Sequence, residues 1–507
     1  MFSRQRVHPI LKQAGWLRSH ERTPLSTFCP LRRNIAELYK SEKRPETVMD
    51  PEIKALVAKG EMMPPRRPPV FQPSQEWTQS IRKTMEGPLS EKLSHLHEYR
   101  EAGLELQKHL KHRKPPLEGG ELKQRQKKID DKIAAEFGPE ILELQDRPSE
   151  IRKRMKRLEN AYIHKWAPIE FDETGAITYL VTRSAGEFAT LKRIFNEIKN
   201  KNPQFQPRTL FDFGSGLTTG LWAFKDTFGA VTEAFCVDPS KEMNDLSRLI
   251  LAEGSDNMDI PAGISFRLHN PATINLEYDV VLSSHSLLEL DGQTARLESI
   301  HSLWSRVQEG GVLVILESGT NAGFQLVTEA RDYLVQVSHL ASTGQAKEGL
   351  AGHVMAPCPH DLPCPKYHQD TAPCNFTVRY NNFDLPGLEP STTRYETFSY
   401  VVFKKGARET ESFPRLVEPP VKTKGSFYCR LCTSQGGLQE VLCKKSADLD
   451  LFQLTKRLGC GDDLPVKLLP WVKKEKIGTP WMKRQQREKF EKHEKDNIER
   501  GMTEENV

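Results

Sequence analysis

Residues 209–240 read TLFDFGSGLTTGLWAFKDTFGAVTEAFCVDPS, and this stretch decides the fold. It begins with a short apolar run, TLFDFG, that ends in a glycine turn. A helical pattern follows, and then a second apolar run, AFCVDP, that ends in an acid and a proline. A strand, a helix and a strand in this order predict a βαβ unit with parallel strands.

The same alternation continues on both sides of this unit. An amphipathic helix, GEFATLKRIFNEIKN, precedes it. After it come a helix, SKEMNDLSRLILAEG, two strands, ISFRLHN and YDVVLSSH, a helix through residue 307, and a further strand, GGVLVILES. Repeated βα units predict an α/β fold, in which helices cover both faces of a parallel sheet.

The ends of the first two strands mark the expected ligand crevice, because open α/β sheets bind ligands beyond the carboxyl ends of their strands. The first strand closes with Asp212, Gly214 and Gly216, and the second closes with Asp238. Glycines allow a tight turn and a close approach of the backbone to a ligand, although such a turn can also be purely structural. An acid at the place of Asp238 can hold the two hydroxyls of a ribose.

The crevice lacks several familiar motifs. There is no G-x-G-x-x-G, which argues against a dinucleotide, and no G-x-x-x-x-G-K-[ST] of a P-loop. The fourth strand runs into Ser284-His285-Ser286 and not into the Asn/Asp-Pro-Pro-aromatic turn typical of nitrogen methylation. Neither the fourth nor the fifth strand ends in a cysteine for carbon-5 methylation. His285 could act as a base, but a lone histidine at a strand end more often makes a local hydrogen bond. The sequence therefore predicts a cofactor crevice without an identifiable reaction centre.

Cysteines are concentrated late in the chain: of nine, seven lie beyond residue 350. The segment PCPHDLPCPKYHQDTAPC places Cys358, Cys364 and Cys374 each directly after a proline. Three thiolates need a fourth partner, for which we favour Cys432 over its neighbour Cys429.

The spacing of these cysteines leaves the metal open. Structural zinc uses two short Cys-x2-4-Cys knuckles, and only Cys429 and Cys432 fit that rule. A [4Fe-4S] cluster tolerates irregular spacing and flanking prolines, so spacing slightly favours iron-sulfur over zinc. Unliganded thiols are the remaining interpretation.

The N-terminal residues have the composition of a mitochondrial transit peptide. Residues 1–34 contain seven Lys and Arg residues and the single acid Glu21, and they lack the apolar region of a secretory signal. Five prolines between residues 64 and 73 predict an extended arm without a long helix, and two or three charged helices are expected over residues 91–160. One of these helices carries five Lys and Arg residues within residues 152–157, either as a solvated face or as a surface for RNA phosphates.

Length and composition fit this organisation. At roughly 100 to 200 residues per domain, 507 residues predict two or three units. The mean hydropathy of −0.58 and the lack of a long apolar run exclude a membrane-spanning helix. We expect a transit peptide (1–34), an arm with charged helices (35–160), a Rossmann-like domain (161–345), a cysteine-rich region with closing strands (346–445) and a basic tail (446–507).

The motifs FQPRTLFDFGSG, CVDPS, YDVVLSSHSLLEL, GGVLVILESGTNAG and APCPHDLPCP together resemble the mitochondrial ribosome-associated methyltransferase-like family. The resemblance covers roughly residues 160 to 435 and implies a class I S-adenosylmethionine methyltransferase fold. It also implies that Asp212, Gly214 and Gly216 form the methionine-binding turn, that Asp238 binds the ribose, and that the cysteines hold a [4Fe-4S] cluster. This chain has Thr218 where the family's turn often has another glycine.

From the resemblance we expect a mitochondrial matrix protein that binds the small ribosomal subunit, its rRNA and its proteins, and that assists assembly as a pseudoenzyme. The interleaved cations and Trp471 and Trp481 of the tail, which could stack on unpaired bases, favour an RNA partner, although a solvated charged helix is equally compatible with them. The alternative is an active S-adenosylmethionine-dependent mitochondrial rRNA methyltransferase. A third, weaker possibility is a metal-dependent RNA-binding module with a vestigial crevice.

Overall fold

The computed structural model describes residues 45–65, 68–93, 95–255, 259–271, 276–347, 349–370, 372–385, 392–409 and 412–469. The expected transit peptide, Trp471 and Trp481 lie outside the described residues. Within the described ranges, no helix is both long and apolar enough to cross a membrane.

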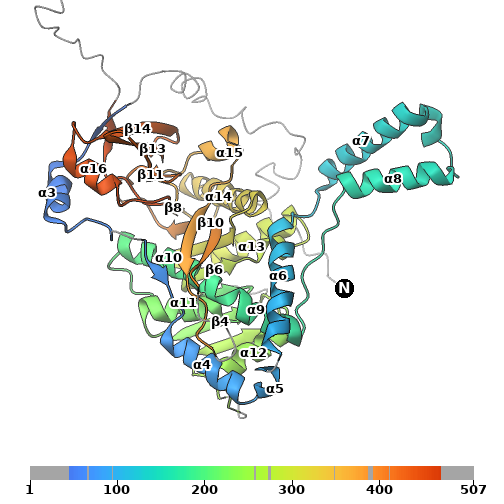
Figure 1. Ribbon diagram of the computed structural model, residues 1–507, viewed down its shortest axis with the longest axis horizontal. Coiled ribbons are helices and arrows are strands. Elements are labelled where there is room, and N and C mark those ends of the chain that lie inside the picture. Colours follow the sequence, from blue (N-terminus) through green and yellow to red (C-terminus); the bar gives the residue numbers. More distant parts are fainter. Residues whose placement is uncertain are drawn as a thin grey trace, which may run out of the picture.

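A nine-stranded sheet forms the centre of the molecule (Figure 1). Its order is β2-β9-β10-β7-β6-β3-β4-β5, and β8 pairs with β10. The five predicted strands are confirmed and run parallel as β3 (Thr209–Phe213), β4 (Glu233–Val237), β5 (Ile264–Arg267), β6 (Tyr278–Ser284) and β7 (Val307–Ser318).

The other half of the sheet is mixed, which corrects the expectation of a parallel sheet. Strand β10 (Arg394–Lys405) runs antiparallel to β7, and β8 (Gly352–Ala356) and β9 (Phe376–Tyr380) run antiparallel to β10. The two-residue strand β2 (Val70–Phe71) completes this edge, parallel to β9. The long antiparallel β10 closes the sheet beside β7, so the cysteine-bearing segment between β8 and β9 remains at its edge.

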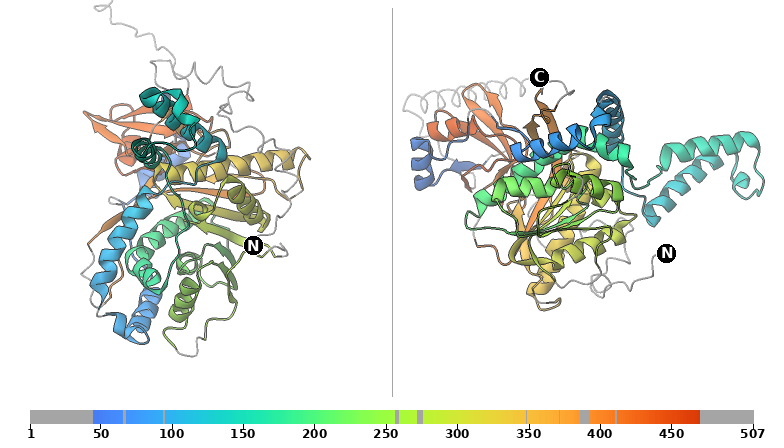
Figure 2. Two further views of the ribbon diagram at one scale, coloured as in Figure 1. Left: turned by 90° about the vertical axis from the view of Figure 1, so that its right-hand side faces the viewer. Right: turned by 90° about the horizontal axis from the view of Figure 1, so that it is seen from below.

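Helices cover both faces of the sheet (Figure 2). Successive side chains of β7 point to opposite faces of the sheet. Val312, Val314 and Leu316 therefore pack into one core, and Leu313 and Ile315 pack into the other. The first core is covered by α9 (Glu173–Thr182), α10 (Ser184–Lys201), α11 (Thr219–Phe228) and α12 (Lys241–Leu251). The second is covered by α13 (Gln293–Ser305) and α14 (Asn321–Ser342).

The expected extended arm is instead partly helical and packed. It contains α3 (Pro51–Lys59), α4 (Gln75–Glu86) and α5 (Ser90–Leu93). The five prolines all lie between α3 and α4, so they separate two helices and break neither. Trp77 of α4 is fully buried and stacks on Trp222 of α11 with ring centroids 6.0 Å apart, which fixes α4 to the first core.

The predicted charged helices are confirmed as α6 (Leu96–His112), α7 (Gly119–Phe137) and α8 (Ser149–Tyr162), with a 3-10 turn (Pro139–Leu142) after α7. Helix α6 packs against α9, whereas α7 and α8 form a hairpin that projects from the body of the molecule (Figure 1). Ile129, Ile133, Ile151 and Leu158 form a separate small core inside this hairpin.

A second sheet follows the Rossmann-like domain. It contains β11 (Arg415–Leu416), β12 (Val421–Thr423), β13 (Ser426–Cys432) and β14 (Leu438–Lys444), and it packs with α16 (Leu449–Thr455) and α3. Strand β15 (Lys467–Leu469) pairs with β1 (Glu46–Val48). Residues 449–469 were expected in a basic tail, but apolar side chains such as Leu451 and Leu464 bury them in this unit.

Candidate functional site

The predicted crevice opens where the chain direction across the sheet switches, between β3 and β6. A cavity of about 2390 Å³ lies there, and its lining includes Gly214, Gly216, Asp238 and His285. Ordinary small-molecule sites are roughly 300–1,000 Å³. The crevice is therefore large enough for a cofactor together with part of a second molecule.

The glycine turn has different constraints at its two glycines. Gly214 has a φ of +73°, and a Cβ added to it would lie 2.0 Å from Oγ of Ser286, so this glycine is required by packing. Gly216 has a φ of +47°, but a Cβ there would meet nothing within 4 Å. Open space beside the backbone of Gly216 is the space that a bound ligand needs.

Thr218 also takes a left-handed conformation, with a φ of 54°. This conformation is costly for a β-branched residue, which explains why glycine is usual at such a position. Thr218 is buried, and its hydroxyl donates to the carbonyl of Leu217 at 2.7 Å. The turn therefore keeps the shape expected of a glycine-rich turn despite the substitution.

Asp238 joins the end of β4 to this turn. One carboxylate oxygen accepts from the backbone N–H of Gly216 and the other from that of Ser240, both at 2.9 Å. Burial raises the pKa of Asp238, and these two hydrogen bonds oppose that change. Each carboxylate oxygen has a second lone pair, so the side chain can still accept from a pair of ribose hydroxyls.

Asp212 does not line the cavity, unlike the other three predicted residues. Its side chain lies against α11, where a Cβ on Gly220 would be 2.6 Å from Oδ2, and neither carboxyl oxygen has a partner among the described residues. Burial raises the pKa of Asp212 well above its usual value, and the charges of Glu187 and Asp238 raise it further. A cation bound near these three acids would favour their ionised forms.

The far wall of the crevice is formed by residues that we did not predict. Glu187 of α10 accepts from the hydroxyls of Ser284 at 2.7 Å and Tyr179 at 3.1 Å, and Arg183 pairs with Glu396 of β10 at 3.0 Å. The one sequence signal was an acid, Glu187, on the buried face of an amphipathic helix. Arg183 and Glu396 are 213 positions apart and meet only through the sheet topology.

His285 occupies the end of β6 with a φ of 55°. Burial lowers its pKa to about 3, and the nearby charge of Arg183 acts in the same direction. The imidazole is therefore neutral at physiological pH, and its Nε2 has no partner within the described part of the chain. A neutral ring can exchange a hydrogen bond but cannot supply a positive charge.

The second candidate site gathers four of the five predicted cysteines. Cys358 and Cys364 lie between β8 and α15 (Pro365–Gln369), Cys374 precedes β9, and Cys432 ends β13. Burial raises the pKa of Cys374 well above its usual value, and the thiols of Cys364, Cys358 and Cys432 raise it further. The fold thus brings the end of β13, which carries Cys432, to the proline-rich segment that carries the other three cysteines.

Cys429 points elsewhere because it lies on the opposite face of β13 from Cys432. It shares a core with Phe427 and Leu431 and hydrogen-bonds with Cys443, which raises the pKa of Cys429. Of the Cys-x-x-Cys pair, Cys432 therefore adjoins the other three cysteines.

A buried arginine lies near three of the four thiols, those of Cys358, Cys364 and Cys432. Arg331 of α14 donates to the carbonyls of His360 at 2.9 Å and Leu362 at 2.6 Å. Burial alone would lower the pKa of Arg331, but the charges of Cys358, Asp332 and Cys364 raise it overall. A fixed cation here stabilises thiolates and hence an anionic metal centre.

The thiols are gathered without forming a metal site. In the described residues, no group of three or more His, Cys, Asp or Glu side chains is arranged to hold a metal ion. Thiolates are ligands for both zinc and iron-sulfur clusters, so the donor set by itself does not distinguish the two.

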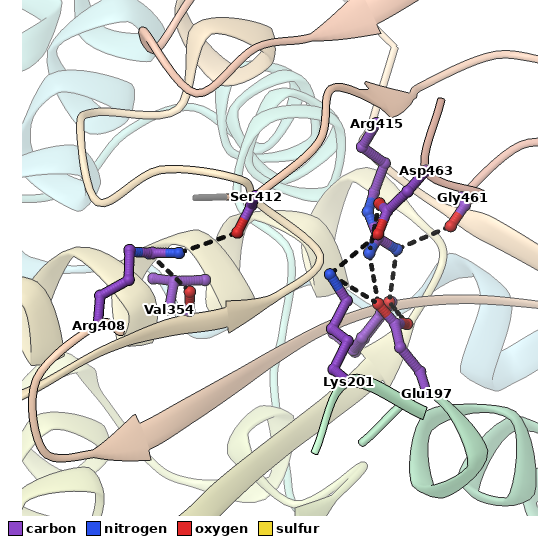
Figure 3. Close-up of polar contacts among 9 residues, drawn as sticks. Glu197, Lys201, Val354, Arg408, Ser412, Arg415, Gly461 and Asp463 are labelled. Carbon is purple, nitrogen blue, oxygen red and sulfur yellow. Dashed lines mark hydrogen bonds and ion pairs between the residues drawn. The ribbon is translucent and has the colours of Figure 1, made fainter. Parts of the chain in front are cut away.

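An ion-pair network beside this site fixes the second sheet to the Rossmann-like domain (Figure 3). Arg415, opposite Cys432 in the β11–β13 pairing, contacts Glu197 of α10 and lies 3.0 Å from Asp463. Lys201 of α10 also pairs with Asp463 at 3.0 Å. These contacts position Cys432 relative to the other cysteines.

The strand order, the antiparallel β10 and the glycine turn with Asp238 define a protein of the class I methyltransferase fold. The family model described as mitochondrial small ribosomal subunit Rsm22 matches residues 173–465, and the chain belongs to this family.

Comparison with known proteins gives relatives in animals and fungi. The chain is 32% identical to the human ribosome assembly protein METTL17, mitochondrial, over 69% of this chain and 75% of the relative. It is 25% identical to the Schizosaccharomyces pombe Rsm22-cox11 tandem protein 2, mitochondrial, over 59% of this chain and 45% of the relative. A precorrin-6y C5,15-methyltransferase from Geobacter metallireducens aligns with a TM-score of 0.27 and 11% identity, covering 42% of this chain and 87% of that one.

Proposed function

We propose that the protein is a mitochondrial matrix factor that binds the small ribosomal subunit during assembly and uses its methyltransferase fold for binding, without transferring a methyl group. Membership of the Rsm22 family, which spans the Rossmann-like domain and the second sheet, carries this proposal. The human relative is named a ribosome assembly protein, which supports it.

The α7–α8 hairpin supplies a surface for ribosomal RNA. Lys153, Lys156 and Arg157 are exposed at helical spacing, so they lie on one face of α8. Arg152 and Arg154 pair instead with Asp146 at 3.0 Å and Glu136 at 2.5 Å. Three of the five predicted cations are thus available to contact phosphates.

S-adenosylmethionine is the cofactor that the crevice supports. Gly216 leaves space for it, Asp238 accepts from the ribose hydroxyls, and the neighbouring acids favour its positive charge. When bound, the cofactor supplies an activated methyl group. In this proposal Asp238 and the glycine turn only bind and orient it, and the bound cofactor stabilises the crevice.

Cys358, Cys364, Cys374 and Cys432 hold a structural [4Fe-4S] cluster in this account, with zinc as the alternative. Cys364 and Cys432 are buried, Cys358 and Cys374 are half-buried, and the nearby cation of Arg331 supports a thiolate centre. The cluster would join the β8–β9 segment to the second sheet, so that its loss would loosen the attachment of that sheet.

An active rRNA methyltransferase is the second candidate, and the size of the crevice favours it. The cavity of about 2390 Å³ has room for a nucleotide beside the cofactor, and His285 lies in its lining. His285 would hold the attacking amine or hydroxyl through a hydrogen bond at its Nε2, and its lowered pKa makes it a weak base.

A rescue experiment separates the two candidates. Cells depleted of the protein would receive the wild type, Asp238→Ala or, as a control, Asp245→Ala on the exposed side of α12. Asp238→Ala is a better choice than a substitution of Gly214, which would clash with Ser286. Equal rescue of small-subunit levels by all three, with loss of cofactor binding by Asp238→Ala, supports the binding role. Loss of rescue together with loss of an rRNA methyl mark would establish the enzyme.

A further inference from the structure

One end of the second sheet carries three lysines around a small hollow. Lys424 lies in the turn between β12 and β13, and Lys444 and Lys445 lie at the end of β14. These lysines line a cavity of about 530 Å³ together with Gly425, Ser426 and Ser446. We call this hollow the lysine cradle.

Backbone pairing holds the cradle in shape. Lys444 is directly opposite Ser426, so their side chains stand on one face of the sheet. The N–H of Lys445 donates to the carbonyl of Gly425 at 3.0 Å, which joins the end of β14 to the turn. Gly425 has a φ of +74°, and nothing lies within 4 Å of where its Cβ would be. Lys444 is thus held in a paired strand, and Lys424 and Lys445 lie in the turns that this backbone hydrogen bond joins.

Within the described residues, no acid neutralises the charges of the cradle. All three lysines are exposed, and none forms an ion pair with an acid in the described ranges. The adjacent acid, Asp448, accepts from the N–H of Leu451 at 3.0 Å and pairs with Lys54 at 2.9 Å. Like charges held together in this way repel one another, so an anionic partner would be stabilised there.

An aromatic residue lies on the same face of the sheet as Lys444. Tyr428 lies two residues after Ser426 on β13. It pairs with Leu442 of β14 on one side and with Val421 of β12 on the other, and these three side chains form a row. Val421 is 58% exposed, so this row borders solvent. Cations next to an aromatic and apolar row are the combination that holds a nucleic acid strand by its phosphates and stacks its bases.

We propose that the lysine cradle binds phosphate groups of a single-stranded RNA segment, with a base of that segment against the Tyr428 row. This inference rests on the proposed function, since the RNA in question is small-subunit rRNA. The hydroxyls of Ser426 and Ser446 add neutral donors for phosphate oxygens. The site is separate from the α8 face and from the crevice, so the protein would contact RNA at two distant places.

The test measures binding of a short fluorescein-labelled fragment of the small-subunit rRNA by anisotropy at several KCl concentrations. The cradle variant is Lys424→Gln with Lys444→Gln and Lys445→Gln. The control removes three exposed lysines elsewhere, Lys59, Lys83 and Lys241, and so makes the same change in net charge. We expect the cradle variant to bind about tenfold more weakly and its salt slope to fall by about 2, since each contact to a single strand contributes about 0.7.

Three results would overturn the inference. In the first, the cradle variant and the control lose affinity equally, which leaves the proposed function intact. In the second, poly-glutamate binds the wild type through these lysines while RNA does not, which would assign the cradle to an acidic protein segment. In the third, the wild type binds no RNA but still sediments with the small subunit, which would show that it docks through ribosomal proteins. Circular dichroism of both variants checks that the second sheet stays folded.

Discussion

Gly214 and Gly216 lie in one turn, yet only one of them leaves room for a ligand. The sequence predicts the turn and its acid because strand, glycine and helix signals are local. It could not predict that Asp212 faces α11 or that Glu187 faces the crevice, because both depend on how distant helices pack. The residues of the turn were thus open to prediction from local sequence, whereas the residues of the far wall and the surroundings of Asp212 were not.

Cofactor binding should depend on Asp238. Asp238→Ala removes the carboxylate that accepts from Gly216 and Ser240, so we expect S-adenosylmethionine affinity to fall at least about tenfold, the cost of one charge-assisted hydrogen bond. Isothermal titration calorimetry measures this, with Asp245→Ala as the control. Unchanged affinity in Asp238→Ala would place the cofactor elsewhere.

Buried acids predict a dependence of stability on pH. Burial raises the pKa of Glu317 to about 8, so the stability that its protonated form contributes is present at low pH and is lost as the pH rises through about 8. Glu317→Gln keeps an oxygen for the N–H of Leu287 and cannot ionise. Each pKa unit corresponds to 1.36 kcal/mol, a figure that we reduce because the structure can relax around the charge. Between pH 5 and pH 8 we therefore expect the unfolding free energy of the wild type to fall by about 1–3 kcal/mol relative to that of this variant.

Urea unfolding at the two pH values measures the difference. Glu298→Gln on the exposed side of α13 serves as the control, and it should follow the wild type. Parallel pH profiles of the wild type and Glu317→Gln would show that Glu317 is already ionised at pH 5.

Helix α4 shows how elements depend on context. The prolines correctly predicted a break, but not that the residues after them would form a helix against α11. Ser74 caps that helix by accepting from the N–H of Trp77 at 3.2 Å, and Trp77 enters the core between Trp222 and Phe188. The parallel strands were predictable from their apolar runs, whereas the antiparallel pairing of β10 with β7 joins residues too far apart for local patterns to show.

Trp77→Ala should destabilise the Rossmann-like domain. The side chain is fully buried, so its removal leaves a cavity and should cost about 3–5 kcal/mol of unfolding free energy. Gln79→Ala, on the exposed side of the same helix, should change it by less than about 0.5 kcal/mol. Chemical denaturation distinguishes them, and equal stability of the two variants would mean that α4 does not pack on the core in solution.

The whole molecule combines a Rossmann-like domain, a projecting hairpin and a second sheet. The network of Arg415, Glu197 and Asp463 and the cysteine cluster both lie where the second sheet meets the central domain. The sequence favoured Cys432 over Cys429, and the alternation of β13 explains why Cys432 lies with the other three cysteines. If these cysteines hold the proposed [4Fe-4S] cluster, docking of the second sheet should be the property most sensitive to its loss.

Cys364→Ala should remove bound iron and sulfide and loosen the second sheet. Cys429→Ala, which alters a thiol outside the cluster, should retain both. Iron and sulfide analysis of anaerobically purified protein, with hydrogen exchange of β13 and β14, measures the effect. Stoichiometric zinc in the wild type, or equal iron in both variants, would contradict the assignment.

The most direct test of the central claim is sedimentation of the protein in a sucrose gradient of mitochondrial lysate, with small-subunit levels measured after its depletion. We predict that the protein sediments with small-subunit particles and that its depletion lowers the level of the small subunit before that of the large one. Expression of Asp238→Ala should restore the level of the small subunit. Sedimentation only as free protein, with unchanged small-subunit levels after depletion, would contradict a role in small-subunit assembly.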